Sequence, residues 1–343
     1  MMSGQRPSPP NRVNLMHHRQ LGKDGFSVSE IGLGCWQFGG DFGPITDDTA
    51  EGIMRAAVRC GVNFFDTANV YGDGHSEVLI GRFLQSLGPD ARSIRVATKY
   101  GRGPDAYPDS YSLAGMRHAV TDSLLRLQVE KIDLLQLHCV PTEVLREGHI
   151  FDWLRELQSE GLIEHFGASV ESVEEGLICL EQPGLVSLQV IFNLLRQKLA
   201  TELLPQAASR GVGIIVRLPL ASGLLTGKFD AATTFTPQDH RHYNRDGQHF
   251  NVGETFAGLP FDVGVRLANR LKTICHDGSL AERSLRWILD HPAVSTVIPG
   301  ASTPDQVRAN ASASDLNPLP PEMHQRLAAF YHHEVAQFIR GPY

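Results

Sequence analysis

Eight short apolar runs, most of them joined by stretches with helical periodicity, limit more than any other feature how this chain can fold. Short apolar runs that alternate with helical segments are typical of strands in a parallel sheet, because each connection between parallel strands needs a crossover. The runs cover Ile31–Trp36, Phe64–Thr67, Val96–Lys99, Leu134–His138, Phe166–Ser169, Leu188–Asn193, Ile214–Leu218 and Thr296–Pro299.

The stretches between the runs carry the signals of helix ends. A glycine follows several of them, and glycine just past a helix takes the left-handed conformation that ends it. The chain has 343 residues, somewhat more than the roughly 250 typical of an eight-stranded barrel. The pattern therefore predicts an α/β protein with a (β/α)8 TIM barrel rather than an open doubly wound sheet. The expected helices are Asp47–Arg59, Ser76–Leu87, Leu113–Leu127, Phe151–Glu160, Val173–Leu180 and Thr201–Ser209.

Four segments lie outside this repeat. Residues 19–28 read as an N-terminal β-hairpin with a glycine-rich turn at Gly22–Gly25. Ala221–Pro260 forms a loop of about 40 residues after the seventh strand, a length usual for lids and binding loops. A C-terminal helix is expected at Met323–Ile339. Residues 1–18 are predicted to be a disordered tail, which leaves 19–343 as a single domain.

Net charge and cysteine content indicate which kinds of partner and which cellular compartment to expect. The net charge of −7 and the absence of basic runs argue against nucleic acid, so we expect a small-molecule partner. The five cysteines are scattered without C-x-x-C spacing, which favours reduced thiols in a cytoplasmic protein. The N-terminal segment lacks the apolar core of a signal peptide or membrane anchor. The histidine pairs lack the ligand spacing of a metal site, so no metal is expected.

One nucleotide-binding fold is excluded directly. Gly32-Leu33-Gly34 is followed by Cys35-Trp36-Gln37, and the next helix begins only near Asp47. No G-x-G-x-x-G therefore lies between a strand and a helix, as a Rossmann domain requires.

Four polar side chains lie where catalytic groups collect in a parallel barrel. Asp66, Lys99 and His138 end the second, third and fourth expected strands, and Tyr71 follows Asp66 by five residues. A phenol has a pKa of about 10, and a neighbouring ammonium lowers it. Asp66 would serve as the counter-ion of Lys99, and His138 can donate a hydrogen bond to a substrate oxygen. The four residues form a candidate proton-transfer site.

These residues and the ordered motifs around them make the chain resemble the aldo-keto reductase superfamily. The resemblance implies carbonyl reduction with NAD(P)H, in which Tyr71 is the general acid, Lys99 and Asp66 tune it, and His138 orients an aldehyde, ketone or sugar carbonyl. The motifs that carry it are the hairpin, Ile31-Gly32-Leu33-Gly34-Cys35-Trp36, Phe65-Asp66-Thr67-Ala68-Asn69-Val70-Tyr71-Gly72, Ala97-Thr98-Lys99, Asp133–His138, Gly167-Ala168-Ser169 and Ile298-Pro299-Gly300.

The resemblance also implies where the cofactor binds. Ser169 and Gln189 match positions that bind the nicotinamide carboxamide, and Arg217 stands where many relatives stack an aromatic ring. A barrel-mouth ion pair is the alternative role for Arg217. The segment 221–228 matches the loop along the pyrophosphate, and the helix that starts after Gly300 offers an anion site for the adenosine phosphate. The full set of implied cofactor residues is Gly34, Trp36, Ser169, Gln189, Arg217, Leu218, Pro219, Leu220, Gly223, Leu225, Gly227, Lys228, Pro299, Gly300, Ser302, Thr303, Gln306 and Asn310.

The chain departs from the familiar family pattern at several of these positions. Val170 replaces an Asn that often follows the serine, and Gly300 and Gln306 replace the Lys and Arg that hold the NADP 2′-phosphate. Ala309 replaces a Glu that contacts the adenine. NADP(H) remains the favoured cofactor, with NAD(H) or use of both as the alternative.

Other functions stay open on the sequence. Lys99 could form a Schiff base in a barrel lyase, and Asp66 with His138 could bind a metal in a hydrolase. The fold also occurs in channel β-subunits, so a nucleotide-binding regulatory subunit with slow turnover is a third reading. Within the long loop, residues 239–247 could close over the cofactor as a lid or remain a solvated loop. Trp36, Tyr100 and Cys139 border the inferred mouth and could shape the substrate pocket.

Overall fold

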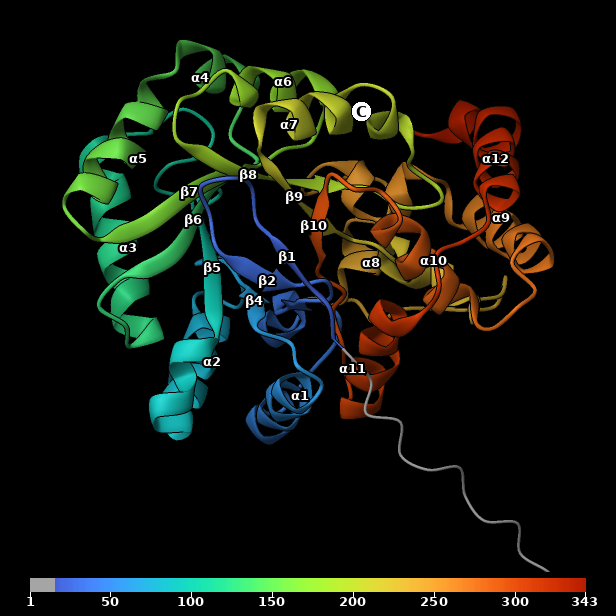
Figure 1. Ribbon diagram of the computed structural model, residues 1–343, viewed down its shortest axis with the longest axis horizontal. Helices are drawn as coiled ribbons and strands as arrows, with labels where there is room; N and C mark the ends of the chain where they lie inside the picture. The colour runs from blue at the N-terminus through green and yellow to red at the C-terminus, as the bar shows by residue number, and fades with distance from the viewer. Residues whose placement is uncertain (1–15) are drawn as a thin grey trace, which may run out of the picture.

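The computed structural model describes residues 16–343 and forms a parallel barrel (Figure 1). Eight parallel strands follow one another in chain order, and bridges from Ile31 to Val297 and from Gly34 to Gly300 join the first strand to the last. All eight runs expected to be strands are confirmed, with shifts of a few residues at their ends. The strands are β3 (Leu33–Gly34), β4 (Phe64–Asp66), β5 (Arg95–Tyr100), β6 (Ile132–His138), β7 (Ile163–Ser169), β8 (Leu185–Ile191), β9 (Gly213–Arg217) and β10 (Val294–Val297).

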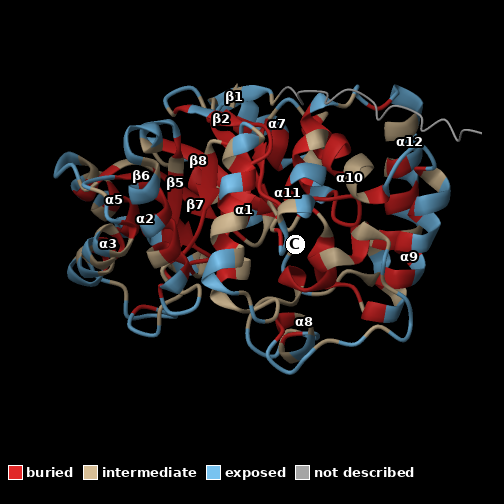
Figure 2. Cartoon of the chain, turned by 90° about the horizontal axis from the view of Figure 1, so that it is seen from below, coloured by how far each residue is buried: buried red, intermediate tan, exposed pale blue. Residues whose placement is uncertain are grey.

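Helices surround the strands, and their inner faces are buried while their outer faces are exposed (Figures 1 and 2). The three expected helices with hydroxyl caps have the bounds that the sequence predicts: Thr46, Ser112 and Ser172 each accept a hydrogen bond from a first-turn N–H. The helices are α1 (Asp47–Arg59), α2 (His75–Leu87), α3 (Leu113–Leu127), α4 (Thr142–Glu147), α5 (His149–Ser159), α6 (Val173–Leu180), α7 (Leu203–Arg210), α8 (His240–Tyr243), α9 (Phe261–Ile274), α10 (Leu280–Leu289), α11 (Pro304–Ala311) and α12 (Pro321–Phe330).

The predicted hairpin closes one end of the barrel. Strands β1 (His18–Gln20) and β2 (Ser27–Ser29) pair antiparallel. The hairpin residues Leu21, Phe26 and Val28 share a buried cluster with Phe64, Ala97, Leu134, Val186, Ile215 and Ile298. Burial of each large side chain contributes about 1.5–3 kcal/mol. With this end filled by apolar side chains, the opposite end, at the carboxyl termini of the strands, is the open one.

Side-chain alternation along the strands sets a polar layer above this apolar one. Phe64 and Asp66 are two residues apart on β4, as Ala97 and Lys99 are on β5, so each pair faces the same side of the sheet. Because Phe64 and Ala97 point into the barrel, Asp66 and Lys99 do so as well, one layer nearer the open end.

Two expectations about the segments outside the repeat need correction. Of the predicted tail, residues 1–15 lie outside the described residues, but His18 is already part of β1 and the His17 N–H donates to Ser314 Oγ at 3.0 Å. The expected C-terminal helix ends early: α12 stops at Phe330, and a π turn (Tyr331–Val335) and a 3₁₀ turn (Ala336–Phe338) follow.

Within the long loop after β9, 3₁₀ turns and α8 occur, and several of its residues are buried. Helices α9 and α10 follow the loop and were not predicted. A capping box at Ser279 and Glu282 marks the start of α10 and could have revealed it. Across residues 16–343, no helix is both long enough and apolar enough to span a bilayer.

Candidate active site

A buried ion pair stands at the centre of the polar layer. Lys99 Nζ donates to Asp66 Oδ1 at 2.5 Å, to the Thr67 carbonyl at 2.7 Å and to Tyr71 Oη at 3.2 Å. The second oxygen of Asp66 accepts hydrogen bonds from Gln136 Nε2 at 2.9 Å and Gln189 Nε2 at 2.7 Å. Lys99 is 1% exposed, yet each of its three ammonium donors has an acceptor, which is what a buried charge requires.

Burial and this ion pair decide which groups carry protons. Burial lowers the pKa of Lys99, but the charges and hydrogen bonds of Asp66 and Tyr71 together outweigh it, and the pKa of Lys99 is raised overall. Burial raises the pKa of Tyr71, and the opposing effect of the Lys99 ammonium does not offset it. The sequence predicted a lowered phenol pKa, and that prediction is wrong because the desolvation of Tyr71 is the larger effect. Tyr71 is therefore protonated at neutral pH and able to donate.

His138 completes the group. Its ring lies 6.0 Å from the Tyr71 ring, centroid to centroid, with the planes nearly perpendicular. Burial, aided by the positive charges of Arg102, Lys99 and Arg217, lowers the pKa of His138 well below its usual value. The imidazole is thus neutral at neutral pH. Its Nδ1 is buried and has no hydrogen-bond partner among the described residues, so the histidine retains bonding capacity for a ligand.

A cavity of about 320 Å³ opens above these side chains, and Asp66, Tyr71 and His138 line it. The volume is at the small end of the range for ligand pockets. The Trp36 indole lies over the Tyr71 ring, with the two planes inclined by 22° and the centroids 6.0 Å apart. Tyr100, expected near the mouth, is not among the cavity's lining residues and instead packs against Tyr111. The expected cofactor residues that line the cavity are Gly34, Trp36, Gln189, Arg217, Leu218, Pro219 and Gly300.

The remaining expected cofactor residues lie outside this cavity. Ser169 donates to Gln189 Oε1 at 3.5 Å. In the segment from Leu220 to Lys228, Leu225 is fully buried in the core and Lys228 is exposed. Gly223 has φ +102, and a Cβ there would lie 2.7 Å from the Phe229 ring. Gly227 ends this turn in the left-handed conformation.

The other expected cofactor residues lie at or near the start of α11. Thr303 caps the helix, Ser302 N–H donates to Gln306 Oε1 at 2.7 Å, and Asn310 Nδ2 donates to the Gly300 carbonyl at 3.4 Å. Pro299 lies between β10 and these residues. Its carbonyl oxygen accepts a hydrogen bond from the Gly34 N–H.

A second cavity, of about 210 Å³, connects the two regions. Its lining includes Ser302, Thr46, Thr49, Gln37 and Phe42. Gln37 and Phe42 also line the larger cavity. The two cavities adjoin, and together they run from Tyr71 to the N-terminus of α11. An elongated dinucleotide, with its reactive ring at one end and its phosphates near a helix N-terminus, fits this path.

Four charged residues, Arg102, Glu171, Arg217 and Glu254, also line the larger cavity and form what we call the charged ring. Arg102 contacts Glu254 through two hydrogen bonds, at 2.7 and 3.1 Å, and Glu171 at 2.7 Å. Arg217 Nη1 lies 3.1 Å from Glu254 Oε1. Burial raises the pKa of Glu254, but Arg102 and Arg217 bring it down to about 2. Arg217 thus forms the ion pair that we considered as its alternative role, while it also lines the cavity.

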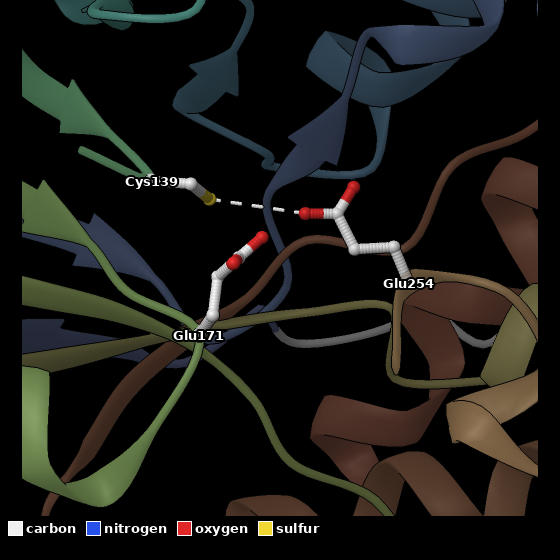
Figure 3. A group of neighbouring side chains, drawn as sticks. All are labelled: Cys139, Glu171 and Glu254. Atoms are coloured by element: carbon white, nitrogen blue, oxygen red, sulfur yellow. Dashed lines mark hydrogen bonds between the residues drawn. The ribbon is translucent and has the colours of Figure 1, made fainter. Parts of the chain in front are cut away.

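Cys139 points into this ring from the end of β6 (Figure 3). Its Sγ and the carboxylates of Glu171 and Glu254 lie within 4.8 Å of one another, a spacing that would suit a metal ion. The two guanidinium groups already bind these carboxylates, and burial raises the pKa of the Cys139 thiol to about 12. A protonated thiol beside neutralised carboxylates makes a poor metal site.

Sequence reasoning missed most of the ring. Arg102 follows β5 by two residues, and Glu171 follows β7 by two, so their place just past strand ends was a usable signal. Glu254 lies inside the long loop, and no local pattern marks it.

Two loops meet over the cavity. Asp41, in the loop after β3, accepts hydrogen bonds from Trp36 Nε1 at 2.8 Å and from Tyr243 Oη at 2.7 Å. The Asp41 carbonyl also accepts from His240 N–H at 2.8 Å. The segment 239–247 is therefore packed against the loop after β3, not free in solvent.

Comparison with known proteins shows the family of this chain. The model of the aldo/keto reductase family matches residues 30–332. An uncharacterized oxidoreductase, YqkF, of Bacillus subtilis is 30% identical over 90% of this chain and 94% of its own length. A probable voltage-gated potassium channel subunit beta of Arabidopsis thaliana is 31% identical over 89% and 93%. The solved aldo-keto reductase AKR11C1 from Bacillus halodurans superposes with a TM-score of 0.74 at 30% identity, covering 92% of this chain and 96% of that one. The chain belongs to the aldo/keto reductase family, whose members are oxidoreductases.

Proposed function

We propose that this protein reduces an aldehyde, ketone or sugar carbonyl with a nicotinamide cofactor, using Tyr71 as the proton donor. The observation that carries the proposal is the Lys99 contact to both Asp66 and Tyr71 at the floor of a cavity that His138 also lines. When bound, the nicotinamide supplies a hydride to the carbonyl carbon. Tyr71 donates its proton to the carbonyl oxygen, and the adjacent Lys99 ammonium stabilises the phenolate that remains. Neutral His138 donates a hydrogen bond to the same oxygen.

Lyase chemistry at Lys99 finds less support. A Schiff base needs a neutral amine, whereas the contact with Asp66 raises the pKa of Lys99 and holds it as an ammonium. A metal held by Asp66 would have to displace Lys99 and two glutamine amides from the same carboxylate.

NADP(H) is the favoured cofactor within this proposal, because Ser302 and Thr303 place hydroxyls at the N-terminus of α11. NAD(H) is the alternative, since positions 300 and 306 carry no cation and Arg308 contacts Asp305 at 3.4 Å. The deciding experiment is a parallel fluorescence titration with NADH and NADPH, followed by a panel of carbonyls with the tighter nucleotide. Saturable binding and turnover of a carbonyl are expected. No response to either nucleotide would contradict the proposal.

The pH dependence of reduction follows from two pKa shifts. The lowered pKa of His138 keeps it neutral as pH falls, and the raised pKa of Tyr71 keeps it protonated as pH rises. Acid should therefore inactivate the protein only when the pH falls below the lowered pKa of His138. Base should inactivate it only when the pH rises above the raised pKa of Tyr71. We expect kcat/KM for reduction to be level between about pH 6 and 8, where an ordinary histidine titrates. An inflection near the usual histidine pKa that disappears in His138→Asn would show that the imidazole titrates there.

We further propose that segment 239–247 is a lid held by Asp41 over the bound cofactor. Asp41→Ala removes the acceptor of both Trp36 Nε1 and Tyr243 Oη, so the two loops should separate more readily. The expected result is a dissociation rate of the nicotinamide nucleotide that rises about tenfold, in line with the loss of one or two hydrogen bonds of about 1 kcal/mol each. Stopped-flow fluorescence measures this rate. Asp246→Ala, in the same loop but bonded to Arg340, is the control; equal rates in the two variants would argue against the lid.

A further inference from the structure

The charged ring at the cavity wall has no net charge, although it contains four ionisable groups. Arg102 and Arg217 are matched by Glu171 and Glu254 at distances of 2.7–3.1 Å. Below the ring, the Lys99 ammonium is matched by Asp66. An anionic substrate would therefore find no unmatched cation among the protein groups that line the cavity, and would have to compete with a carboxylate for its guanidinium.

The ring nevertheless keeps capacity for neutral polar groups. Arg217 Nε is buried without a hydrogen-bond partner among the described residues. The second carboxylate oxygen of Glu171 forms no hydrogen bond within residues 16–343, and this side chain remains 18% exposed beside the cavity. The free oxygen of Glu171 is thus the acceptor that the ring offers at the cavity surface. A substrate hydroxyl can donate to this oxygen, whereas an unsubstituted carbon chain cannot.

The cavity also has aromatic and apolar lining residues. They are Trp36, Val70, Tyr107 and Phe250, and the Phe250 ring centroid lies 5.7 Å from the Arg102 guanidinium. Tyr107 is 49% exposed at the cavity edge. A short hydroxylated carbon chain matches this mixed lining, because its C–H groups can contact the aromatic rings while its hydroxyls face the charged ring. The volume of about 320 Å³, which the nicotinamide must share, leaves room only for a small substrate.

We propose that the charged ring selects short, uncharged hydroxylated carbonyl compounds, such as hydroxyaldehydes, over unsubstituted and over anionic ones. This inference rests on the proposed carbonyl reduction and adds the substrate class and its determinant. Glu171 is the specificity-determining residue, because it alone in the ring combines an accessible free acceptor with contact to the cavity. Its effect is on binding of the substrate hydroxyls, with no part in the transfer of hydride or proton.

The test compares three aldehydes of one carbon skeleton: glyceraldehyde, propanal and glyceraldehyde 3-phosphate, with concentrations expressed as free carbonyl. For the wild-type protein, kcat/KM should be about tenfold or more higher for glyceraldehyde than for each of the others, as expected for a hydrogen bond to a charged group. The ratio of two substrates on one preparation is independent of how much protein is folded.

Three variants locate the effect. Glu171→Leu should lower the glyceraldehyde-to-propanal ratio about tenfold, through KM more than kcat. Glu171→Gln keeps an acceptor oxygen and should retain most of the ratio. Glu174→Leu changes an exposed glutamate that contacts Arg146 outside the cavity, and should leave the ratio unchanged.

The outcomes separate this inference from the function beneath it. A wild-type ratio near one, a preference for glyceraldehyde 3-phosphate, or an unchanged ratio in Glu171→Leu would overturn the substrate class while leaving carbonyl reduction in place. Failure to bind either nucleotide, together with failure to reduce any compound of the carbonyl panel, would overturn the proposed function and this inference with it.

Discussion

Tyr71→Phe is expected to lower kcat for carbonyl reduction by roughly 10²–10⁴-fold, the usual contribution of a general acid. The substitution removes one oxygen from a ring held between Trp36 and His138, so the ring contacts remain. Lys99 keeps its contacts with Asp66 and the Thr67 carbonyl. Affinity for the nicotinamide nucleotide should therefore change little. Steady-state kinetics and fluorescence titration measure the two quantities separately.

A matched control lies on the neighbouring strand. Tyr100 directly follows Lys99 on β5, but its ring packs against Tyr111 away from the cavity. Tyr100→Phe removes the same oxygen from a buried ring on the other face of the sheet. It should leave kcat within about twofold, because this oxygen does not line the cavity. Equal turnover in wild type and Tyr71→Phe would refute the assignment of the proton donor.

Lys99→Met is expected to reduce both activity and stability. The variant leaves the Asp66 carboxylate buried with only two neutral amide donors, so the free energy of unfolding should fall by about 3–5 kcal/mol. Reduction should slow at least about 100-fold, because no cation then stabilises the phenolate. Denaturant titration and initial rates give the two values.

The double variant Lys99→Met/Asp66→Asn separates these effects. It removes both charges of the pair, so stability should recover by a few kcal/mol, on the order of the loss. Activity should remain low, since the ammonium is still missing. Arg55→Met, which breaks the exposed Arg55–Glu51 pair, should cost at most about 1 kcal/mol. Recovery of activity in the double variant would show that Lys99 acts only through stability.

The order of the barrel and the position of the four central residues could be predicted because both depend on local patterns. Apolar runs of strand length are visible in the sequence, and alternation along β4 and β5 places Asp66 and Lys99 on the inner face. The same local signals placed α1, α3 and α6, each of which begins after a hydroxyl cap.

Features that depend on the path of a long loop could not be predicted. Glu254 reaches Arg102 across 152 positions of sequence, and no periodicity encodes that approach. The raised pKa of Tyr71 was missed for a related reason: proximity of a lysine can be inferred from strand ends, whereas the degree of burial that outweighs it depends on the packing of Trp36 and the surrounding loops.

The central claim is that a hydride reaches a carbonyl carbon at the mouth of this barrel, with the proton supplied by Tyr71. The most direct measurement uses nicotinamide cofactor that carries deuterium at the transferred position, with NMR analysis of the product. The account predicts an alcohol with deuterium on the carbinol carbon from the wild-type protein, and almost none from Tyr71→Phe at equal nucleotide occupancy. An alcohol without deuterium, or equal yields of labelled alcohol from both proteins, would contradict it.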